Sequence, residues 1–170
     1  MKTEICNIWD KHKEGNLVCI TTNGFVTQNG LAVCGRGVAA QAAKKYPSFK
    51  RALADAVMKN GNVVQRVIGT LVSFPVKPVA GICRPDKTNV VKHMRNKFGP
   101  YSYVPGWAMM ADIHLIEWGL VQLNYMHIAG MFDKIYLPKP GCGAGGLSWY
   151  DVEPFCRQWG DWLIVCDLKG

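Results

Sequence analysis

Two short apolar segments of this chain each end in a glycine-rich loop, and each loop leads into a helix-like pattern. The first segment is 16–22, which is followed by a loop within 24–37. The second is 134–137, followed by 141–146, where four of the six residues are glycine. In open α/β sheets, ligands bind outside the carboxyl ends of the strands. This duplication predicts an α/β fold with two ligand-binding loops at one edge of its sheet.

The glycines suit close contact between backbone and an anion. Glycine adopts positive φ at little cost, so successive amide groups can point into one concave site. A following helix adds free amide groups and the positive end of its dipole. Neither loop has the GxxxxGK[ST] pattern, and the GxGxxG-like spacing in 141–146 is not at the usual first strand. We expect two loops that clamp a nucleotide diphosphate; the alternative is that the glycines only form tight turns and close helix-to-sheet contacts.

Strand and helix patterns alternate along the chain. We expect strands at 4–10, 16–22, twice within 63–74, at 134–138 and at 161–168, and helices at 38–46, 49–58, 109–123 and 148–159. Such alternation predicts a three-layer α/β/α domain around a central mixed sheet. The 170 residues contain no break in composition that marks a linker, so we expect one domain over 1–170.

Composition narrows the classes of function. The seven cysteines are scattered without a CxxC pair, so we expect no metal site, no cofactor and a reduced protein. The N-terminal residues lack the apolar region of a signal peptide, and no apolar run reaches about 18 residues, so we expect no membrane contact. These features predict a monomer in the cytoplasm, which would be the host cytoplasm for a viral protein.

Segment 79–105 is the least regular part of the chain. It holds five Lys/Arg and one Asp, a net charge of +4, against +8 for the whole chain. We expect a basic insertion there, since connections of this length are often functional; the alternative is a solvated loop. A basic surface favours anionic partners, so a phosphorylated small molecule is expected and nucleic acid is a candidate partner.

Three blocks together resemble the macrodomain family, which binds ADP-ribose. They are ITTNGFVTQNGLAVCGRGVAAQAAKKYP (20–47), LVSFPVK (71–77) and IYLPKPGCGAGGLSWYDVEP (135–154). The pattern is most similar to the subgroup of DarG and the terminal ADP-ribose glycohydrolases, and also to phage and bacterial proteins like ADP-ribose 1''-phosphatases. The resemblance implies the macrodomain fold, an ADP-ribose ligand and an ADP-ribosylated substrate.

The resemblance also implies a role for each block. Asn23, with Gly24, matches a residue that contacts the distal ribose, and Leu17 lies where the adenine is expected. The implied ADP-ribose-binding residues are Leu17, Thr22, Asn23, Gly24, Gly35, Arg36, Gly37, Val38, Gly141, Cys142, Gly143, Ala144, Gly145, Gly146 and Leu147. Two acids of the family pattern are missing: Asn16 stands where an aspartate is common before the first strand, and the second loop carries no carboxylate at 144–146.

Lys77 ends the block FPVK, where the DarG-like pattern has FPTK, and the resemblance implies that Lys77 and Asn23 are catalytic. A lysine amine can attack the anomeric carbon of ADP-ribose and form a Schiff base, if desolvation or nearby cations lower its pKa. The alternative is a surface lysine that pairs with a phosphate. We therefore expect an ADP-ribosyl hydrolase acting on nucleic acid or protein. Two alternatives stay open: a phosphatase acting on ADP-ribose 1''-phosphate, and a non-catalytic binder of such nucleotides in phage defence.

Overall fold

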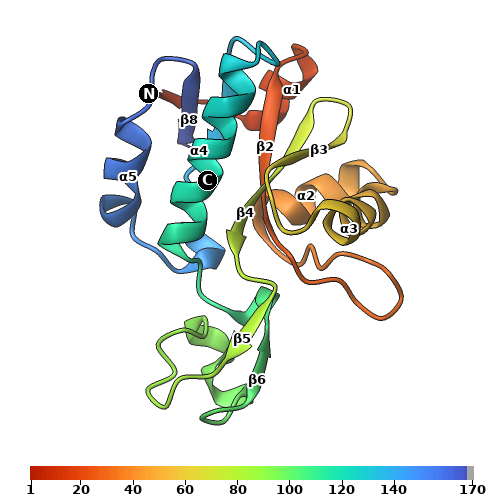
Figure 1. Cartoon of the computed structure of the whole chain (residues 1–170), viewed down its shortest axis with the longest axis vertical. Helices are drawn as coiled ribbons and strands as arrows, with labels where there is room; N and C mark the ends of the chain where they lie inside the picture. The colour runs from red at the N-terminus through yellow and green to blue at the C-terminus, as the bar shows by residue number, and fades with distance from the viewer. Residues whose placement is uncertain (168–170) are drawn as a thin grey trace.

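The computed structural model describes residues 1–167 and contains a six-stranded mixed sheet (Figure 1). Its strands are β1 (Lys2–Ile5), β2 (Leu17–Asn23), β3 (Gln65–Ile68), β4 (Leu71–Lys77), β7 (Ile135–Pro138) and β8 (Leu163–Asp167). The spatial order is β1-β8-β7-β2-β4-β3, and only the β3–β4 pair is antiparallel. The predicted central strands are confirmed, although Leu168, the last residue of the predicted final strand, lies outside the described residues.

Helices cover both faces of the sheet, so the three-layer α/β/α prediction is confirmed (Figure 1). They are α1 (Ile8–Lys13), α2 (Gly37–Lys45), α3 (Phe49–Asn60), α4 (Ile113–Ile128) and α5 (Trp149–Arg157). Alternate residues of β2 serve the two cores: Leu17 and Cys19 pack with α4 and α5, whereas Val18 and Ile20 pack with α1, α2 and α3. This period of two follows from the pleat of a strand buried on both faces.

The first predicted strand, 4–10, is wrong in its second half. The edge strand β1 ends at Ile5, and the short helix α1 begins at Ile8. Asn7 caps this helix, because its side chain accepts a hydrogen bond from the Trp9 amide at 2.9 Å. Ile8 and Trp9 are buried against the sheet, so tertiary packing stabilises a helix too short to show a clear period in the sequence.

Strand β4 is longer than predicted, because it continues through Pro75 to Lys77. Proline lacks an amide donor and is tolerated where a strand has no ladder partner on one side. The ladder to β3 reaches only Ser73, whereas the ladder to β2 continues to Lys77. Beyond Ser73, β4 therefore pairs with β2 but no longer with β3. Its last residue, Lys77, lies at the carboxyl edge of the sheet.

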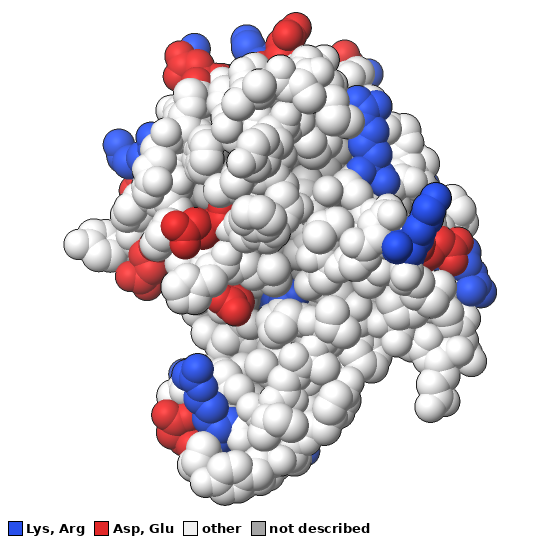
Figure 2. All heavy atoms as spheres, in the orientation of Figure 1, with Lys and Arg blue, Asp and Glu red and all other residues white. Residues whose placement is uncertain are grey.

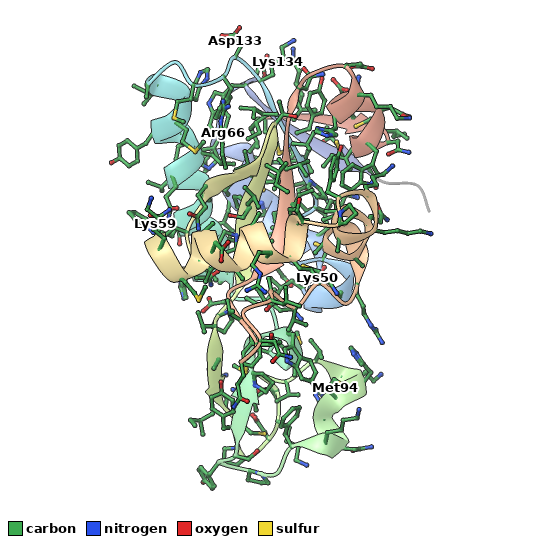
Figure 3. The ribbon with its side chains drawn as sticks, turned by 90° about the vertical axis from the view of Figure 1, so that its right-hand side faces the viewer. Lys50, Lys59, Arg66, Met94, Asp133 and Lys134 are labelled. Carbon is green, nitrogen blue, oxygen red and sulfur yellow. The ribbon has the colours of Figure 1, made fainter. Side chains whose placement is uncertain are left out.

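The segment after β4 forms a small lobe beyond the carboxyl ends of the strands (Figure 1). Its elements are β5 (Ala80–Ile82), η1 (Lys92–Lys97), β6 (Tyr103–Pro105) and η2 (Gly106–Ala108). The lobe has its own buried cluster, made of Cys83, Val90, Val91, Met94, Val104, Ala108 and Met109. In the side view, Met94 lies in this lobe and Asp133 and Lys134 lie at the opposite end of the molecule (Figure 3). Segment 79–105 thus contains short regular elements and contributes most of the residues of this buried cluster.

Met109 belongs to this cluster, so the prediction that α4 begins there is wrong. The helix begins at Ile113, after Asp112, whose side chain accepts a hydrogen bond from the His114 amide at 2.9 Å. It also continues beyond the predicted end to Ile128. The apolar spacing of the sequence does not distinguish Met109, which belongs to the lobe, from the residues of the helix. Asp112 is the better signal, because aspartate is a preferred N-cap residue.

We expect Gly106→Ala to destabilise the junction between the lobe and the sheet. A Cβ at Gly106 would lie 2.0 Å from the carbonyl oxygen of Pro78 and 2.6 Å from that of Val79, both of which are backbone atoms. Overpacking of this kind costs about 2 to 3 kcal/mol. Thermal denaturation should show a lower Tm for Gly106→Ala than for Gly99→Ala, where an added Cβ meets no atom within 4 Å. Equal Tm values would contradict this packing.

Candidate functional site

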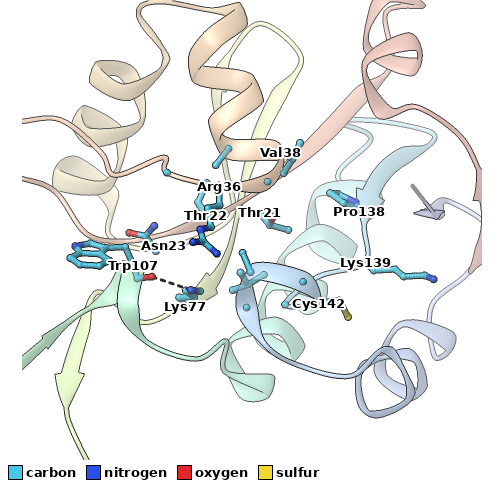
Figure 4. Close-up of a pocket in the computed structure, with 18 of the residues that line it drawn as sticks. Thr21, Thr22, Asn23, Arg36, Val38, Lys77, Trp107, Pro138, Lys139 and Cys142 are labelled. Carbon is cyan, nitrogen blue, oxygen red and sulfur yellow. Dashed lines mark hydrogen bonds between the residues drawn. The ribbon is translucent and has the colours of Figure 1, made fainter. Parts of the chain in front are cut away.

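A cavity of about 560 Å³ lies at the carboxyl edge of the sheet, between the main body and the small lobe (Figure 4). The ends of β2, β4, β7 and β8 border it, together with the first turn of α2, the second glycine loop and residues of the lobe. Cavities of roughly 300 to 1,000 Å³ accommodate small-molecule and cofactor ligands. The two loops predicted from the sequence therefore meet at one pocket.

The first loop carries the start of α2 into the pocket. Arg36 is the N-cap residue, and its side chain makes no capping hydrogen bond, so it does not cover the first amides of the helix. Gly37, Val38 and Ala39 line the cavity at this helix end. Gly37 has φ +60, a conformation that favours glycine. The loop thus presents a helix N-terminus and an arginine to a ligand, an arrangement suited to a phosphate.

The second loop is shaped by three glycines with positive φ: Gly141 at +74, Gly143 at +72 and Gly146 at +80. The loop contains the single 3-10 turn η3 (Gly143–Gly145), and the carbonyl oxygen of Gly145 accepts a hydrogen bond from the Ala111 amide at 2.8 Å. A Cβ at Gly145 would lie 2.9 Å from the Cβ of Ala111, so the loop packs tightly on the segment before α4. The positive φ values give the loop its turns, and the close packing holds it beside the cavity.

Lys77 lies at the carboxyl end of β4, 8% exposed, and lines the cavity. Its Nζ donates a hydrogen bond to the carbonyl oxygen of Trp107 in the lobe at 3.1 Å (Figure 4). Burial, followed by the charge of Arg36, lowers the pKa of Lys77 to about 8. Asn62 supports the strand end from outside the cavity, because its Nδ2 donates to the Lys77 carbonyl oxygen at 3.0 Å. A hydrogen bond therefore holds the lysine at the cavity wall, and its pKa is lowered toward neutral pH.

Asn23 also lines the cavity, next to Lys77 in the β2–β4 ladder. Its Nδ2 donates to the carbonyl oxygen of Val33 at 3.0 Å, and its Oδ1 accepts from the amide of Phe25 at 3.1 Å. Both polar atoms of the side chain thus hold the loop that leads to α2. An amide nitrogen carries two donor hydrogens, so Asn23 keeps one for a ligand while it positions the first loop.

Most, but not all, of the predicted binding residues border the cavity. Those that line it are Thr22, Asn23, Gly35, Arg36, Gly37, Val38, Gly141, Cys142, Gly143, Ala144 and Gly145, together with Lys77. Gly24, Gly146 and Leu147 are outside the lining. A Cβ at Gly24 would meet the Asn62 side chain at 2.5 Å, one at Gly146 would meet Met110 at 2.6 Å, and Leu147 packs on the core. These residues shape the loops from behind.

Leu17 lies at the amino end of β2, six residues before Asn23 and buried in the core at 6% exposure. At about 3.3 Å per residue in a parallel strand, this places it about 20 Å from the pocket edge. The geometry does not support Leu17 as a contact to an adenine in this cavity. Leu17 begins β2, whereas the cavity lies at the carboxyl end of this strand, where Asn23 pairs with Lys77.

Several lining residues were not predicted: Thr21, Val33, Ala39, Val76, His93, Met94, Trp107, Pro138, Lys139, Cys166 and Asp167. Lys139 and Asp167 come at the carboxyl ends of β7 and β8, so the rule that ligands gather there could have found them. The lobe contributes His93, Met94 and Trp107 to the cavity lining. In the sequence, only the basic composition of segment 79–105 indicates that this segment contacts a ligand.

The cavity is strongly cationic at the Lys77 end. Partial desolvation, followed by the positive charges of Arg36, Lys77 and Lys97, lowers the pKa of the exposed His93 side chain. Lys and Arg side chains stand on the lobe, and a further basic patch is visible in the hollow between lobe and body (Figure 2). Within residues 1–167, no group of three or more His, Cys, Asp and Glu side chains is placed to hold a metal ion, and no helix could cross a membrane. Charge and shape thus suit an anionic organic ligand.

The fold is that of a macrodomain. The macrodomain of Mycobacterium tuberculosis DarG superimposes with a TM-score of 0.63 and 18% sequence identity, covering 98% of this chain and 97% of that one. The macrodomain of Thermus aquaticus DarG gives a TM-score of 0.60 and 17% identity, with 99% and 97% coverage. DarTG of Thermosipho africanus in complex with ADP-ribose gives 0.58 and 18%, covering 90% of this chain and 38% of that one.

Comparison with protein-family models finds no match, and comparison with the sequences of curated proteins finds none either. The fold predicted from the resemblance is confirmed by the structural neighbours.

Proposed function

We propose that this protein binds ADP-ribosyl groups and hydrolyses their bond to a nucleic acid or protein, with Lys77 as the nucleophile. The observation that carries the proposal is a nearly buried lysine, of pKa about 8, in one cavity with two glycine loops. The macrodomain fold and the ADP-ribose complex of the DarTG neighbour support the choice of ligand.

The arrangement of the loops gives the ligand a direction. β2 and β7 are neighbours in the sheet, and the two glycine loops follow these strands, so a diphosphate is expected between the loops. β4 adjoins β2 on the other side, so we expect Lys77 to lie beside this diphosphate. A distal ribose attached to the diphosphate can therefore present its anomeric carbon to Nζ of Lys77, and positioning of this kind supplies much of a rate enhancement.

The proposed reaction has two steps. The lone pair of the neutral Lys77 amine forms a bond to the anomeric carbon, while the bond from this carbon to the target breaks with its electron pair and the target takes up a proton. The new C–N adduct loses a proton to solvent and opens to an imine. Water then adds to the imine, which releases ADP-ribose and restores the lysine amine.

Activity should rise with pH. Because the nucleophile is the neutral amine, and the pKa of Lys77 is lowered to about 8, we expect kcat to increase up to about pH 8 and to level off above it. Arg36→Met removes a cation that lowers this pKa, so its inflection should lie at a higher pH than that of the wild type. Single-turnover rates measured from pH 6 to 10 give the pH of the inflection for the wild type and for Arg36→Met. A flat profile, or no movement in Arg36→Met, would contradict the role of the amine.

The test of the function is to incubate the wild type with ADP-ribosylated DNA, RNA and protein and to measure free ADP-ribose. We expect release from at least one class, and the basic lobe favours a nucleic acid. Binding without any release would indicate a non-catalytic binder. Phosphate release from ADP-ribose 1''-phosphate that survives loss of Lys77 would indicate a phosphatase. For that activity the cavity offers one carboxylate, Asp167, on β8 and thus away from the Lys77 end.

A further inference from the structure

Two cysteines lie side by side at the β1 edge of the sheet. Cys6 follows Ile5, the last residue of β1, and Cys166 lies in β8, the strand with which β1 pairs. The Sγ atoms of Cys6 and Cys166 lie 2.8 Å apart, although the two residues are 160 positions apart in the chain. Both side chains pack in the cluster that α1, α2 and α3 form with the sheet. The fold therefore brings thiols from opposite ends of the chain into direct contact.

One thiol of this pair is accessible and the other is buried. The structure describes all seven cysteines, of which Cys6 and Cys142 are half-buried and the other five are buried. Burial, followed by the hydrogen bond with Cys6, raises the pKa of the Cys166 thiol. The Sγ of Cys142 donates to the carbonyl oxygen of Pro140 at 3.7 Å and has no such contact with a second sulfur. Of the two accessible thiols, Cys6 is thus the one that contacts a partner thiol.

An accessible thiol in contact with a buried one suits a two-electron oxidation. When the Cys6 sulfur attacks hydrogen peroxide, an S–O bond forms and the O–O bond breaks. The leaving hydroxide takes the Cys6 proton, which gives a sulfenic acid and one water. The Cys166 sulfur then attacks the Cys6 sulfur, and the displaced hydroxide leaves with the Cys166 proton as a second water. An S–S bond thus replaces two S–H bonds, the two sulfurs lose two electrons and the peroxide gains them.

We propose that Cys6 and Cys166 form a modification site at which a hydroperoxide converts the two thiols into a disulfide that joins β1 to β8. β1 has four residues and, within the described sheet, pairs only with β8. A short edge strand near a chain terminus opens at low cost, and the bridge prevents this opening. The bridge closes a loop of nearly the whole chain, and cross-links over long loops restrict the unfolded chain most. Cys166 also lines the cavity, so the bridge anchors one wall of the ligand site.

The test is to treat the reduced wild type with a small molar excess of hydrogen peroxide and to count free thiols after denaturation. We expect the count to fall from seven to five, and a non-reducing digest to yield cross-linked peptides that carry Cys6 and Cys166. The Tm of the bridged protein should exceed that of the reduced protein by about 5 to 10 °C, the scale expected for a long-loop disulfide in a domain of this size. Dithiothreitol should reverse both changes.

Cys6→Ser and Cys142→Ser are matched variants, because each replaces a half-buried cysteine. Oxidised Cys142→Ser should form the bridge and show the full rise in Tm, whereas Cys6→Ser should show neither. Peptide mapping of the wild type tests the pairing without relying on the folding of any variant. Seven thiols remaining after oxidation, a bridge between other cysteines, or an equal rise in Tm in Cys6→Ser would overturn the inference. The outcome is independent of the proposed function, because no readout involves ADP-ribose.

Discussion

Lys77→Ala should lower the single-turnover rate of ADP-ribose release by at least about 10³-fold, the scale of loss when a nucleophile is removed. The affinity for ADP-ribose should change by only a few-fold, because the two glycine loops hold most of the ligand. Lys77→Arg should be nearly as inactive, since it keeps the charge but supplies no neutral amine at these pH values. Rates and calorimetric affinities measured on the same preparations separate the chemistry from binding.

The matched control is Lys59→Ala, at an exposed lysine near the end of α3, which should retain full activity. We expect the Lys77→Ala variant to fold. Burial of the charged amine is unfavourable, as the lowered pKa of Lys77 shows, and alanine removes this cost. Reduction with borohydride during turnover should attach ADP-ribose to the wild type and not to Lys77→Ala. Retention of wild-type rates by Lys77→Ala would reject the lysine mechanism.

Gly37→Asp should weaken ADP-ribose binding at least about 100-fold. Gly37 begins α2 and lines the cavity, and an added Cβ meets no atom within 4 Å, so the backbone strain at φ +60 is the expected cost of the change. The new carboxylate would face the expected diphosphate, and two charges about 4 Å apart repel by about 4 kcal/mol at an effective dielectric constant of about 20. Calorimetric titration of ADP-ribose measures the loss.

Gly69→Asp controls for backbone strain in this experiment. Gly69 has φ +53, close to the +60 of Gly37, and its added Cβ is also free of contacts, but it lies in the turn between β3 and β4. We expect the two variants to lose similar stability, whereas only Gly37→Asp loses the ligand. Equal affinities of the two variants for ADP-ribose would show that the first loop does not hold a phosphate.

The parts of the site that are local in sequence could be predicted. Both glycine loops directly follow their strands, so short-range patterns located Gly35 to Gly37 and Gly141 to Gly145 beside one edge of a sheet. Lys77 was found through its block, even though β4 was expected to stop before it. The alternation of strands and helices was likewise enough for the three-layer fold, because each element carries its own period.

The parts that depend on tertiary contacts could not be predicted. The hydrogen bond of Lys77 to Trp107 comes from a lobe that returns to the sheet thirty residues later. The burial that lowers the pKa of Lys77 likewise exists only in the folded chain. The pairing of Lys139 with Asp167 depends on β7 and β8 lying side by side. Leu17 lies outside the cavity lining for a related reason, since which end of β2 faces the cavity follows from the whole sheet. Sequence spacing identifies elements, but the assembled sheet decides which of their ends meet.

The central claim, an ADP-ribose site between two glycine loops, is tested most directly by calorimetric titration of the wild type with ADP-ribose, ADP and AMP. We predict one site per chain and tightest binding of ADP-ribose, with ADP weaker because it lacks the ribose that reaches Lys77. AMP should be weaker again, because it lacks a phosphate for the loops. Absence of ADP-ribose binding, or AMP binding as tightly as ADP-ribose, would contradict the account.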